Sequence, residues 1–288
     1  MANCRWILFS DLDGTLLDRE TYEPGPSLDG LNKCESARVP VILTSSKTRA
    51  ELESYHALLA PHPSCPFITE NGGGVFFPID YWDSLQGAES AKHFWRITLG
   101  SAHDRVMQVL KDMARAVGVD IQNFSDMSPE EVAGMTGLSV EEAKLAVQRE
   151  FDEPFWLAEK DYNRLDLVEK EIQQRGMQFS RGGRCLHIHG ASDKGTSAYL
   201  VRQQYEQAYG RVFTAAVGDA ANDFPLFLAV DKAFLVKRPD GRHDSFFQNK
   251  ENIHLLPGEG PSGFFQAVEY LLHHHVKEQD DWPEPIVR

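Results

Sequence analysis

The sequence of 288 residues predicts an α/β fold in two parts, a parallel-sheet core and a smaller inserted α+β domain. Three observations lead to this prediction. Short apolar runs alternate with helical segments at both ends of the chain, which is typical of parallel βαβ units. The middle of the chain has a different texture, with helices, short strands and a hairpin signal. Polar clusters follow several of the apolar runs, where a parallel sheet would place a ligand site.

The first segment, residues 1–82, alternates strands with helices. Pro40 lies near the start of the second apolar run, where a missing N–H group matters least. The fourth apolar run is expected to begin a hairpin at an edge of the sheet. We expect strands at 6–9, 39–43, 67–68 and 75–77, and helices at 28–37 and 49–59.

The middle segment, residues 83–189, is the predicted insert. Ser128 and Ser139 each precede an acidic residue by three positions, which is a helix-start signature. Arg181-Gly182-Gly183-Arg184 is expected to join the last two strands as a hairpin. Residues 127–150 form an excursion to which the sequence assigns no role. We expect strands at 94–99, 155–157, 177–180 and 185–189, and helices at 103–117 and 161–175.

The last segment, residues 190–288, returns to the alternating pattern. His273-His274-His275 is expected to be a surface patch, because neighbouring helical residues do not face one point. Residues 280–288 contain two prolines and are expected to fray. We expect helices at 194–209, 224–229 and 263–273, and strands at 213–217, 233–236 and 253–255.

Composition excludes several classes of protein. The formal net charge of −14 argues against a general affinity for nucleic acid or anionic membranes. No apolar run reaches the length of a membrane span, and no secretory signal is evident at the N-terminus. The four cysteines show neither metal-ligand nor disulfide spacing, so a reducing cytoplasm is the expected compartment. They are Cys4, Cys34, Cys65 and Cys185.

Two carboxylates, Asp11 and Asp13, end the first apolar run. In extended backbone, residues two apart point to the same side, so these carboxylates would repel each other. Such a pair is tolerated when a cation lies between its members or when one member holds a proton. The arrangement suits Mg²⁺, which prefers oxygen ligands. The alternative is an ordinary Asp-Gly turn after a strand.

Three further polar clusters lie at strand ends or helix starts in the same βα context. Thr44-Ser45-Ser46 follows the second strand, Lys194 opens a helix, and residues 218–223 follow the strand at 213–217. Each has a simpler interpretation, respectively a helix cap, a solvated helix residue, and a loop with its cap. Clusters after different parallel strands would converge at one edge of the sheet, so we expect one site.

The order and spacing of these clusters resemble the motifs of the haloacid dehalogenase-like phosphohydrolase superfamily. The resemblance covers about two thirds of the chain and implies a Rossmann-like core. Asp11-Leu12-Asp13-Gly14-Thr15 resembles the first motif, and Gly218-Asp219-Ala220-Ala221-Asn222-Asp223 resembles the fourth. Ser45 resembles the hydroxyl of the second motif, with Thr44 left open as the alternative. Lys194 resembles the lysine of the third.

This resemblance implies Mg²⁺-dependent phosphoryl transfer, and it assigns roles to the matching residues. Asp11 would attack phosphorus, and Asp13 would protonate the leaving alkoxide and then activate water. Lys194 would offset negative charge, and the metal would be held by Asp11, Asp219 and the backbone carbonyl of Asp13. Asn222 and Asp223 would complete the metal network, and Ser45, Ser46 and Lys47 would bind phosphate.

The position of the insert, between the second and third motifs, is that of the larger cap in the Cof-like branch of the superfamily. Ser45-Ser46-Lys47-Thr48, the stretch at 70–74 and the hairpin at 181–184 are together similar to mannosyl-3-phosphoglycerate phosphatases. Members of that family produce the compatible solute mannosylglycerate. The resemblance implies a glycosyl-3-phosphoglycerate as substrate.

Arginine at the hairpin could hold the carboxylate of such a substrate in bidentate fashion, and glycine lets backbone approach a sugar closely. The predicted substrate-binding residues are Asn71, Gly72, Arg181, Gly182, Gly183 and Arg184. An Arg-Gly-Gly-Arg hairpin is also a good exposed turn. His187 either faces the cleft or is an ordinary core or surface histidine.

Three other functions remain open at this point. The glucosyl epimer of the substrate differs at one hydroxyl, and a phosphomutase uses similar motifs. A non-catalytic sugar-phosphate binding protein would lack a nucleophile or metal acid, whereas Asp11, Asp13, Asp219 and Asp223 are all present. No heptad pattern indicates an oligomeric state.

Overall fold

The computed structural model describes residues 5–60, 62–83, 85–182 and 185–274, and it confirms the predicted α/β class. Within these ranges the larger sheet has nine strands in the order β13-β12-β11-β1-β2-β3-β4-β6-β5. Its strands are β1 (Arg5–Ser10), β2 (Val41–Thr44), β3 (Phe67–Thr69), β4 (Gly74–Pro78), β5 (Glu89–Ala91), β6 (Phe94–Thr98), β11 (Val212–Gly218), β12 (Lys232–Lys237) and β13 (Ile253–Glu259).

The strands from β13 to β3 are parallel, as the βα alternation predicts. Leu8 of β1 pairs with Ala215 of β11 on one side and with Val41 of β2 on the other. From β3 onward the pairings are antiparallel. The carboxyl ends of β1, β2, β3 and β11 therefore lie at one edge of the sheet.

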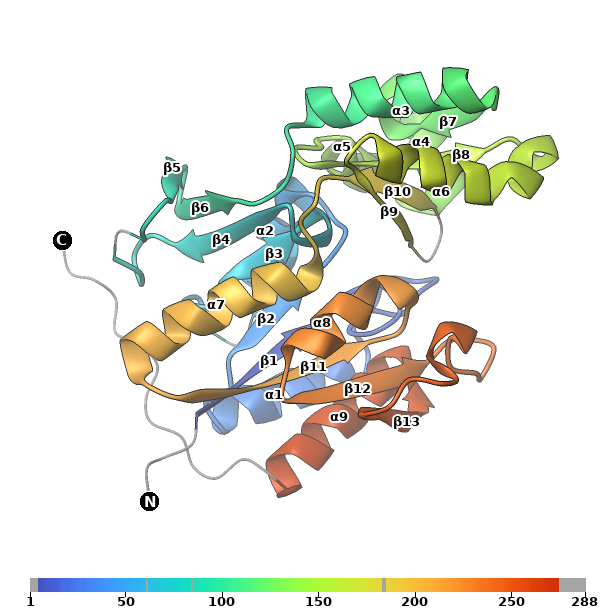
Figure 1. Ribbon diagram of the computed structural model, residues 1–288. Helices are drawn as coiled ribbons and strands as arrows, with labels where there is room; N and C mark the ends of the chain where they lie inside the picture. The colour runs from blue at the N-terminus through green and yellow to red at the C-terminus, as the bar shows by residue number, and fades with distance from the viewer. Residues whose placement is uncertain (1–4, 61, 84, 183–184, 275–288) are drawn as a thin grey trace.

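Helices cover both faces of this sheet (Figure 1). Leu8 belongs to the apolar cluster under α1 (Ser27–Ser36), α2 (Arg49–Leu59) and α9 (Gly260–His274). Ile7 and Phe9 belong to the cluster under α7 (Lys194–Tyr209) and α8 (Phe224–Ala229). Alternate residues of β1 are thus buried on opposite faces, which explains why this strand is an unbroken apolar run.

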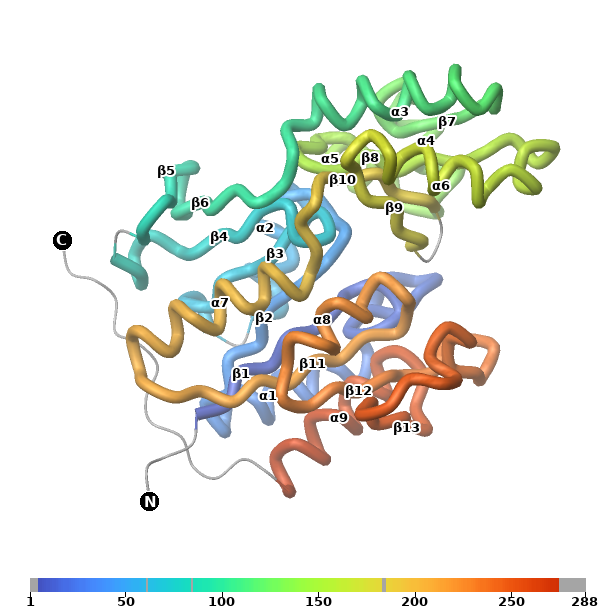
Figure 2. The backbone as a smooth tube through the Cα atoms, in the orientation of Figure 1, coloured from blue at the N-terminus to red at the C-terminus, as the bar shows by residue number. Residues whose placement is uncertain are grey.

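A second, antiparallel sheet lies above the first in the order β7-β8-β10-β9. Its strands are β7 (Ile121–Asn123), β8 (Asp152–Leu157), β9 (Gln178–Arg181) and β10 (Leu186–His189). Helices α3 (His103–Val117) and α6 (Leu165–Gln174) share one apolar cluster with this sheet. Figure 2 shows the chain passing between the two parts twice, from β6 into α3 and from β10 into α7.

The excursion at 127–150 forms a pair of short helices, α4 (Pro129–Thr136) and α5 (Val140–Ala146). Ser128 and Ser139 cap them through the predicted reciprocal capping boxes. The pair has its own small core, which Tyr22 of the larger part also contacts. Short 3₁₀ turns lie at Glu70–Gly72, Phe124–Asp126, Glu159–Arg164, Ala221–Asp223 and Ser245–Phe247.

Two expectations differ from the structure. Residues 89–98 were expected in the insert, but β5 and β6 extend the larger sheet, with Trp95 opposite Phe77. They cover β4, which would otherwise expose its backbone at an edge. We therefore propose that the inserted domain runs from about residue 99 to residue 189. The expected helix at 161–175 begins as the 3₁₀ turn at Glu159–Arg164 and becomes α-helical only at Leu165.

Some expectations fall outside the described residues, namely those for Cys4, His275 and the tail at 280–288. Cys34, Cys65 and Cys185 are free thiols. Within the described ranges, no helix combines the length and apolar character needed to cross a bilayer.

Candidate active site

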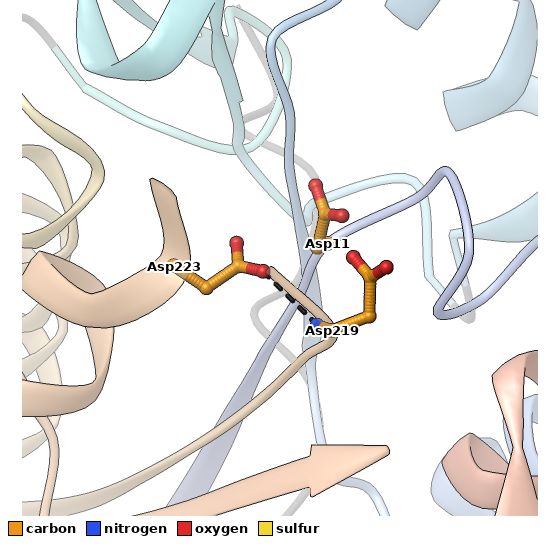
Figure 3. A group of neighbouring side chains, drawn as sticks. All are labelled: Asp11, Asp219 and Asp223. Atoms are coloured by element: carbon orange, nitrogen blue, oxygen red, sulfur yellow. Dashed lines mark hydrogen bonds between the residues drawn. The ribbon is translucent and has the colours of Figure 1, made fainter. Parts of the chain in front are cut away.

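Three buried carboxylates lie together at the carboxyl edge of the larger sheet (Figure 3). Asp11 follows β1, whereas Asp219 and Asp223 follow β11. The two strands are neighbours, with Ser10 paired to Val217, so topology alone brings their ends together. One oxygen from each carboxylate lies within 4.8 Å of the other two. An all-oxygen set of this kind suits a hard divalent cation.

The backbone around these carboxylates is tightly packed. Asp223 accepts hydrogen bonds from the N–H groups of Asp219 and Ala220, each at 3.1 Å, and Figure 3 shows the first. Gly14 has a φ of +83°, and a Cβ there would lie 2.9 Å from Oδ2 of Asp219. The loop of the first motif can therefore approach Asp219 only with glycine at this position.

Lys194 supplies the positive charge of this cluster from the start of α7. It is 1% exposed, and its Nζ lies 2.7 Å from Oδ1 of Asp11 and 2.6 Å from Oδ1 of Asp223. Asp219 is paired separately, with Nη1 of Arg19 at 2.9 Å. The sequence predicted the role of Lys194 but did not single out Arg19.

Electrostatics favours a cation among the three carboxylates. Burial raises the pKa of Asp11 well above its ordinary value, and Asp223 and Asp219 raise it further against the opposing effect of Lys194. Burial and the charge of Asp223 raise the pKa of Asp219 to about 7. Both shifts reflect negative charges crowded in a region with little water. The residues present therefore fit the divalent metal that the first and fourth motifs imply.

Asp13, by contrast, turns its side chain toward Lys47. Nζ of Lys47 lies 3.1 Å from Oδ2 of Asp13 and 3.5 Å from Oε1 of Glu51, and it sits over the ring of Tyr22. Oδ1 of Asp13 is buried and has no hydrogen-bond partner among the described residues. Lys47, predicted to bind phosphate, thus holds the carboxylate predicted to move the proton. Its contact with phosphate stays a prediction.

The hydroxyls of Thr44 and Ser45 are the two candidates for the phosphate-binding hydroxyl of the second motif. That of Thr44 donates to the carbonyl of Ile42 in its own strand, at 3.1 Å. That of Ser45 accepts from the N–H of Lys47 at 3.2 Å, one position past the strand end. Since the Thr44 hydroxyl is engaged within its strand, the geometry favours Ser45. Ser46 lines the cavity beside Lys47.

The model of the haloacid dehalogenase-like hydrolase family matches residues 8–240 of this chain. The chain belongs to this hydrolase family. The match spans both carboxylate motifs, the serine motif, Lys194 and the whole insert. The superfamily prediction from the four motifs is thereby confirmed.

Curated relatives of this hydrolase carry more specific names. A glucosyl-3-phosphoglycerate/mannosyl-3-phosphoglycerate phosphatase of Methanococcoides burtonii is 39% identical over 92% of this chain and 97% of its own. A mannosyl-3-phosphoglycerate phosphatase of Pyrococcus horikoshii is 33% identical over 80% of this chain and 90% of its own. Among solved structures, a haloalkanoate-superfamily phosphatase of Bacteroides thetaiotaomicron shares the fold, with a TM-score of 0.62 and 16% identity over 93% of this chain and 96% of that one.

The predicted substrate residues of the hydrolase fall into two groups. Asn71 is 3% exposed, donates to Asp152 of the insert at 3.0 Å and accepts from Asn222 at 3.4 Å. Asn222, predicted in the metal network, thus turns its amide to Asn71. Gly72 packs under α7, where a Cβ would lie 2.1 Å from the carbonyl oxygen of Asp193. Gly72 therefore has a structural reason to be glycine, and its contact with substrate stays a prediction.

The two strands that the predicted cap hairpin would join, β9 and β10, pair in antiparallel fashion. Arg181 has a side chain that is 55% exposed and lies 3.8 Å from Glu169. Gly182 lies against His187, and a Cβ there would approach Nε2 of the histidine to 2.8 Å. Gly183 and Arg184 lie outside the described residues. His187 is buried, and its Nδ1 lies 2.9 Å from Oδ2 of Asp152.

The sequence analysis missed a second group of buried charges, at the junction of the two parts. Glu70 is fully buried and accepts hydrogen bonds from the N–H groups of Glu150, Phe151 and Asp152. Arg149 lies beside them, with a side chain that is 3% exposed. Glu70 and Asn71 have φ values of 47° and 54°, uncommon for residues other than glycine. The Glu-Asn-Gly-Gly-Gly stretch was noticed in the sequence, but nothing in it indicated a contact with residues eighty positions later.

One cavity connects these groups. It is bounded below by Asp11, Asp13 and Asp219 and above by Arg149, Gly182 and His187 of the insert. Phe124 and Leu138 form an apolar wall. A second groove, lined by Arg181, Arg238 and Lys194 among others, meets the first cavity at Arg19, Gly182 and Asn222. A substrate whose phosphate meets Asp11 would therefore lie between the core and the insert.

Proposed function

We propose that this hydrolase removes the phosphate of mannosyl-3-phosphoglycerate, yielding mannosylglycerate and phosphate, with Mg²⁺ as its metal. The observation that carries the proposal is the buried Lys194 bridge between Asp11 and Asp223, with Asp219 within 4.8 Å of both. This cluster lies at the base of a cavity that residues of the insert also line. The names of the 39% and 33% identical relatives support the choice of substrate.

In the proposed reaction, a carboxylate oxygen of Asp11 forms a bond to phosphorus while the bond from phosphorus to the glycerate oxygen breaks. The product of this step is an aspartyl-phosphate and an alkoxide, to which Asp13 gives a proton. Asp13 then takes a proton from water, which attacks the aspartyl-phosphate and releases inorganic phosphate. Lys194 holds Asp11 in position throughout, as a buried point charge.

Mg²⁺, held by Asp11, Asp219 and Asp223, would supply positive charge to the phosphoryl group. Lys47 has a separate part in this scheme. Because it ion-pairs with Asp13, it fixes the orientation of the group that moves the proton. Ser45 remains the proposed donor to a phosphate oxygen.

The glucosyl epimer is a second candidate substrate, because the Methanococcoides burtonii relative is named for both. The two sugars differ in the orientation of one hydroxyl, so discrimination would rest on individual hydrogen bonds to the sugar. The free thiols of Cys34, Cys65 and Cys185 are compatible with the reducing cytoplasm that we propose as its compartment.

Phosphate release from a panel of monoesters tests the proposal. The panel contains both glycosyl-3-phosphoglycerates, mannose 6-phosphate and glucose 6-phosphate, each with and without MgCl₂. We expect the highest kcat/KM for a glycosyl-3-phosphoglycerate and no turnover after chelation of divalent metals. An equal or higher kcat/KM for the simple hexose phosphates would refute the proposed substrate class.

A further inference from the structure

We infer that Arg149, and not the exposed arginine of the cap hairpin, reads the carboxylate of the substrate's glycerate. This inference rests on the proposed phosphatase function of the site and specifies how the insert selects the substrate.

Arg149 lies in the segment that leads from α5 back into β8, and it points between the two parts of the molecule. Its Nη1 donates to the backbone carbonyl of Ser46 at 3.0 Å. Ser46 belongs to the loop that the second motif assigns to phosphate binding. The guanidinium thus lies directly beside the place where a bound phosphate is expected.

The guanidinium is held rigidly. Oδ1 of Asp152 lies 2.8 Å from Nη2 of Arg149. Asp152 is itself fixed, because its other oxygen accepts from Asn71 at 3.0 Å and contacts Nδ1 of His187 at 2.9 Å. The ring of Phe124 covers one side, with its centroid 5.8 Å from the guanidinium carbon. A cation fixed in this way loses little freedom when it binds an anion.

This guanidinium also has donor capacity to spare. An arginine side chain has five N–H donors. Nε of Arg149 is buried and has no hydrogen-bond partner among the described residues. A buried donor without a partner is costly, and a carboxylate oxygen in the cavity would satisfy it. The unpartnered donor is the observation that points to a ligand.

The other arginine and lysine side chains that line this cavity are paired with the catalytic carboxylates. Arg19 lies 2.9 Å from Asp219, and Lys47 lies 3.1 Å from Asp13. Arg181 lies instead on the second groove, with a side chain that is 55% exposed. Among the described arginines and lysines, Arg149 therefore has the placement that a second anionic group, next to the phosphate, requires.

Two small phosphate esters test this inference because they differ only in the carboxylate. 3-Phosphoglycerate carries it, and glycerol 3-phosphate has a hydroxymethyl group in its place. We expect the wild-type enzyme to prefer 3-phosphoglycerate. Arg149→Met should lower kcat/KM for 3-phosphoglycerate by about 10- to 100-fold, mainly through KM, because a site built to bind a polar group discriminates strongly. Glycerol 3-phosphate should be nearly unaffected.

Arg149→Lys controls for a folding defect in Arg149→Met, since lysine keeps the positive charge and lacks only the planar guanidinium group. We expect Arg149→Lys to retain part of the preference for 3-phosphoglycerate over glycerol 3-phosphate. The ratio of the two kcat/KM values within one preparation does not depend on the fraction of folded enzyme. Arg175→Met is the matched control, because Arg175 pairs with Glu171 on α6 and lines neither cavity.

Two results would overturn the inference. Equal losses on both esters in Arg149→Met would mean that the residue only holds the insert in place. Loss of the preference in Arg181→Met, with the preference kept in Arg149→Met, would assign the carboxylate to the hairpin. A wild-type preference for 3-phosphoglycerate that depends on Arg149, together with no turnover of either glycosyl ester, would refute the proposed function and leave the inference standing.

Discussion

Two clusters of buried charge face each other across the cavity, and they are built in different ways. The lower cluster contains Asp11, Asp219, Asp223 and Lys194. Each of these residues lies just after a strand of the larger sheet or at the start of a helix that packs on it. The upper cluster joins Glu70 of the core to Arg149, Asp152 and His187 of the insert. The lower cluster is arranged by strand order alone, whereas the upper one exists only after the two parts dock.

Their charge balance differs as well. Three carboxylates and Lys194 leave the lower cluster with excess negative charge, which a divalent cation would offset. In the upper cluster, burial opposes ionisation, but Arg149 and His187 lower the pKa of Asp152 to about 2. Although burial acts in the opposite direction, Cys185 and Asp152 raise the pKa of His187 to about 10. The upper cluster therefore carries both signs of charge in near balance, whereas the lower one has an excess of negative charge.

Removing the nucleophile should give the largest effect on activity. Asp11→Asn keeps the shape of the side chain but removes the attacking oxygen anion. We expect kcat to fall by roughly 10⁴-fold or more, in line with loss of a nucleophile in other enzymes. The melting temperature should stay close to that of the wild type. Phosphate release and thermal unfolding check this, and substantial residual turnover would contradict the aspartyl-phosphate mechanism.

Removing the buried cation of the lower cluster should affect both activity and stability. Lys194→Met leaves Asp11 and Asp223 buried without their partner, which typically costs about 3–5 kcal/mol. Urea unfolding measures this cost in metal-free buffer. Lys144→Met is the control, since the side chain of Lys144 is 51% exposed and pairs with Glu141 at the surface. This variant should unfold at the same urea concentration as the wild type. An unchanged midpoint for Lys194→Met would mean that its ion pairs are energetically neutral.

The contrast between the clusters explains what could be predicted from sequence. Strand order and the rule that ligands bind at carboxyl ends are enough to bring Asp11, Asp219 and Lys194 together. The choice between Ser45 and Thr44 stays a prediction, because it depends on hydrogen-bond directions that the sequence does not reveal.

The upper cluster could not be predicted, because each of its residues has an unremarkable local sequence. Arg149 follows a short helix, and Asp152 begins a strand. Their partners Ser46 and Glu70 lie about 80 to 100 positions earlier and in the other part of the molecule. Residues 89–98 were placed in the insert for a related reason, since sequence pattern does not tell which sheet a short strand joins.

The stability of the upper cluster should depend on pH through the titration of Glu70. Burial raises the pKa of Glu70 from an ordinary value near 4.5 to about 7, despite the opposing charge of Arg149. The folded state then binds this proton more tightly than the unfolded state, so ionising Glu70 destabilises the fold. This penalty is absent below about pH 4.5, grows as the pH rises to about 7 and is complete above it.

Glu70→Gln removes that titration. The difference in unfolding free energy between wild type and Glu70→Gln should therefore change across the same pH range, by up to a few kcal/mol at about 1.4 kcal/mol per pKa unit. Urea unfolding of both proteins from pH 4.5 to 8 in metal-free buffer measures it. Taking the difference cancels the titration of Asp219, which both proteins share. A difference that does not vary with pH would show that Glu70 titrates near its ordinary value.

The smallest effect is expected at the exposed side of the same junction. Arg96 pairs with the carboxylate of Glu150 at 2.6 Å. The backbone N–H group of Glu150 in turn donates a hydrogen bond to Glu70. Arg96 is 27% exposed, so salt and water screen its ion pairs. Arg96→Met should change the unfolding free energy by at most about 1 kcal/mol, and less in 1 M NaCl. A larger destabilisation by Arg96→Met than by Glu70→Gln at pH 5 would contradict this ranking. It would mean that the ion pairs of Arg96 hold the insert to the core more strongly than the buried side chain of Glu70 does.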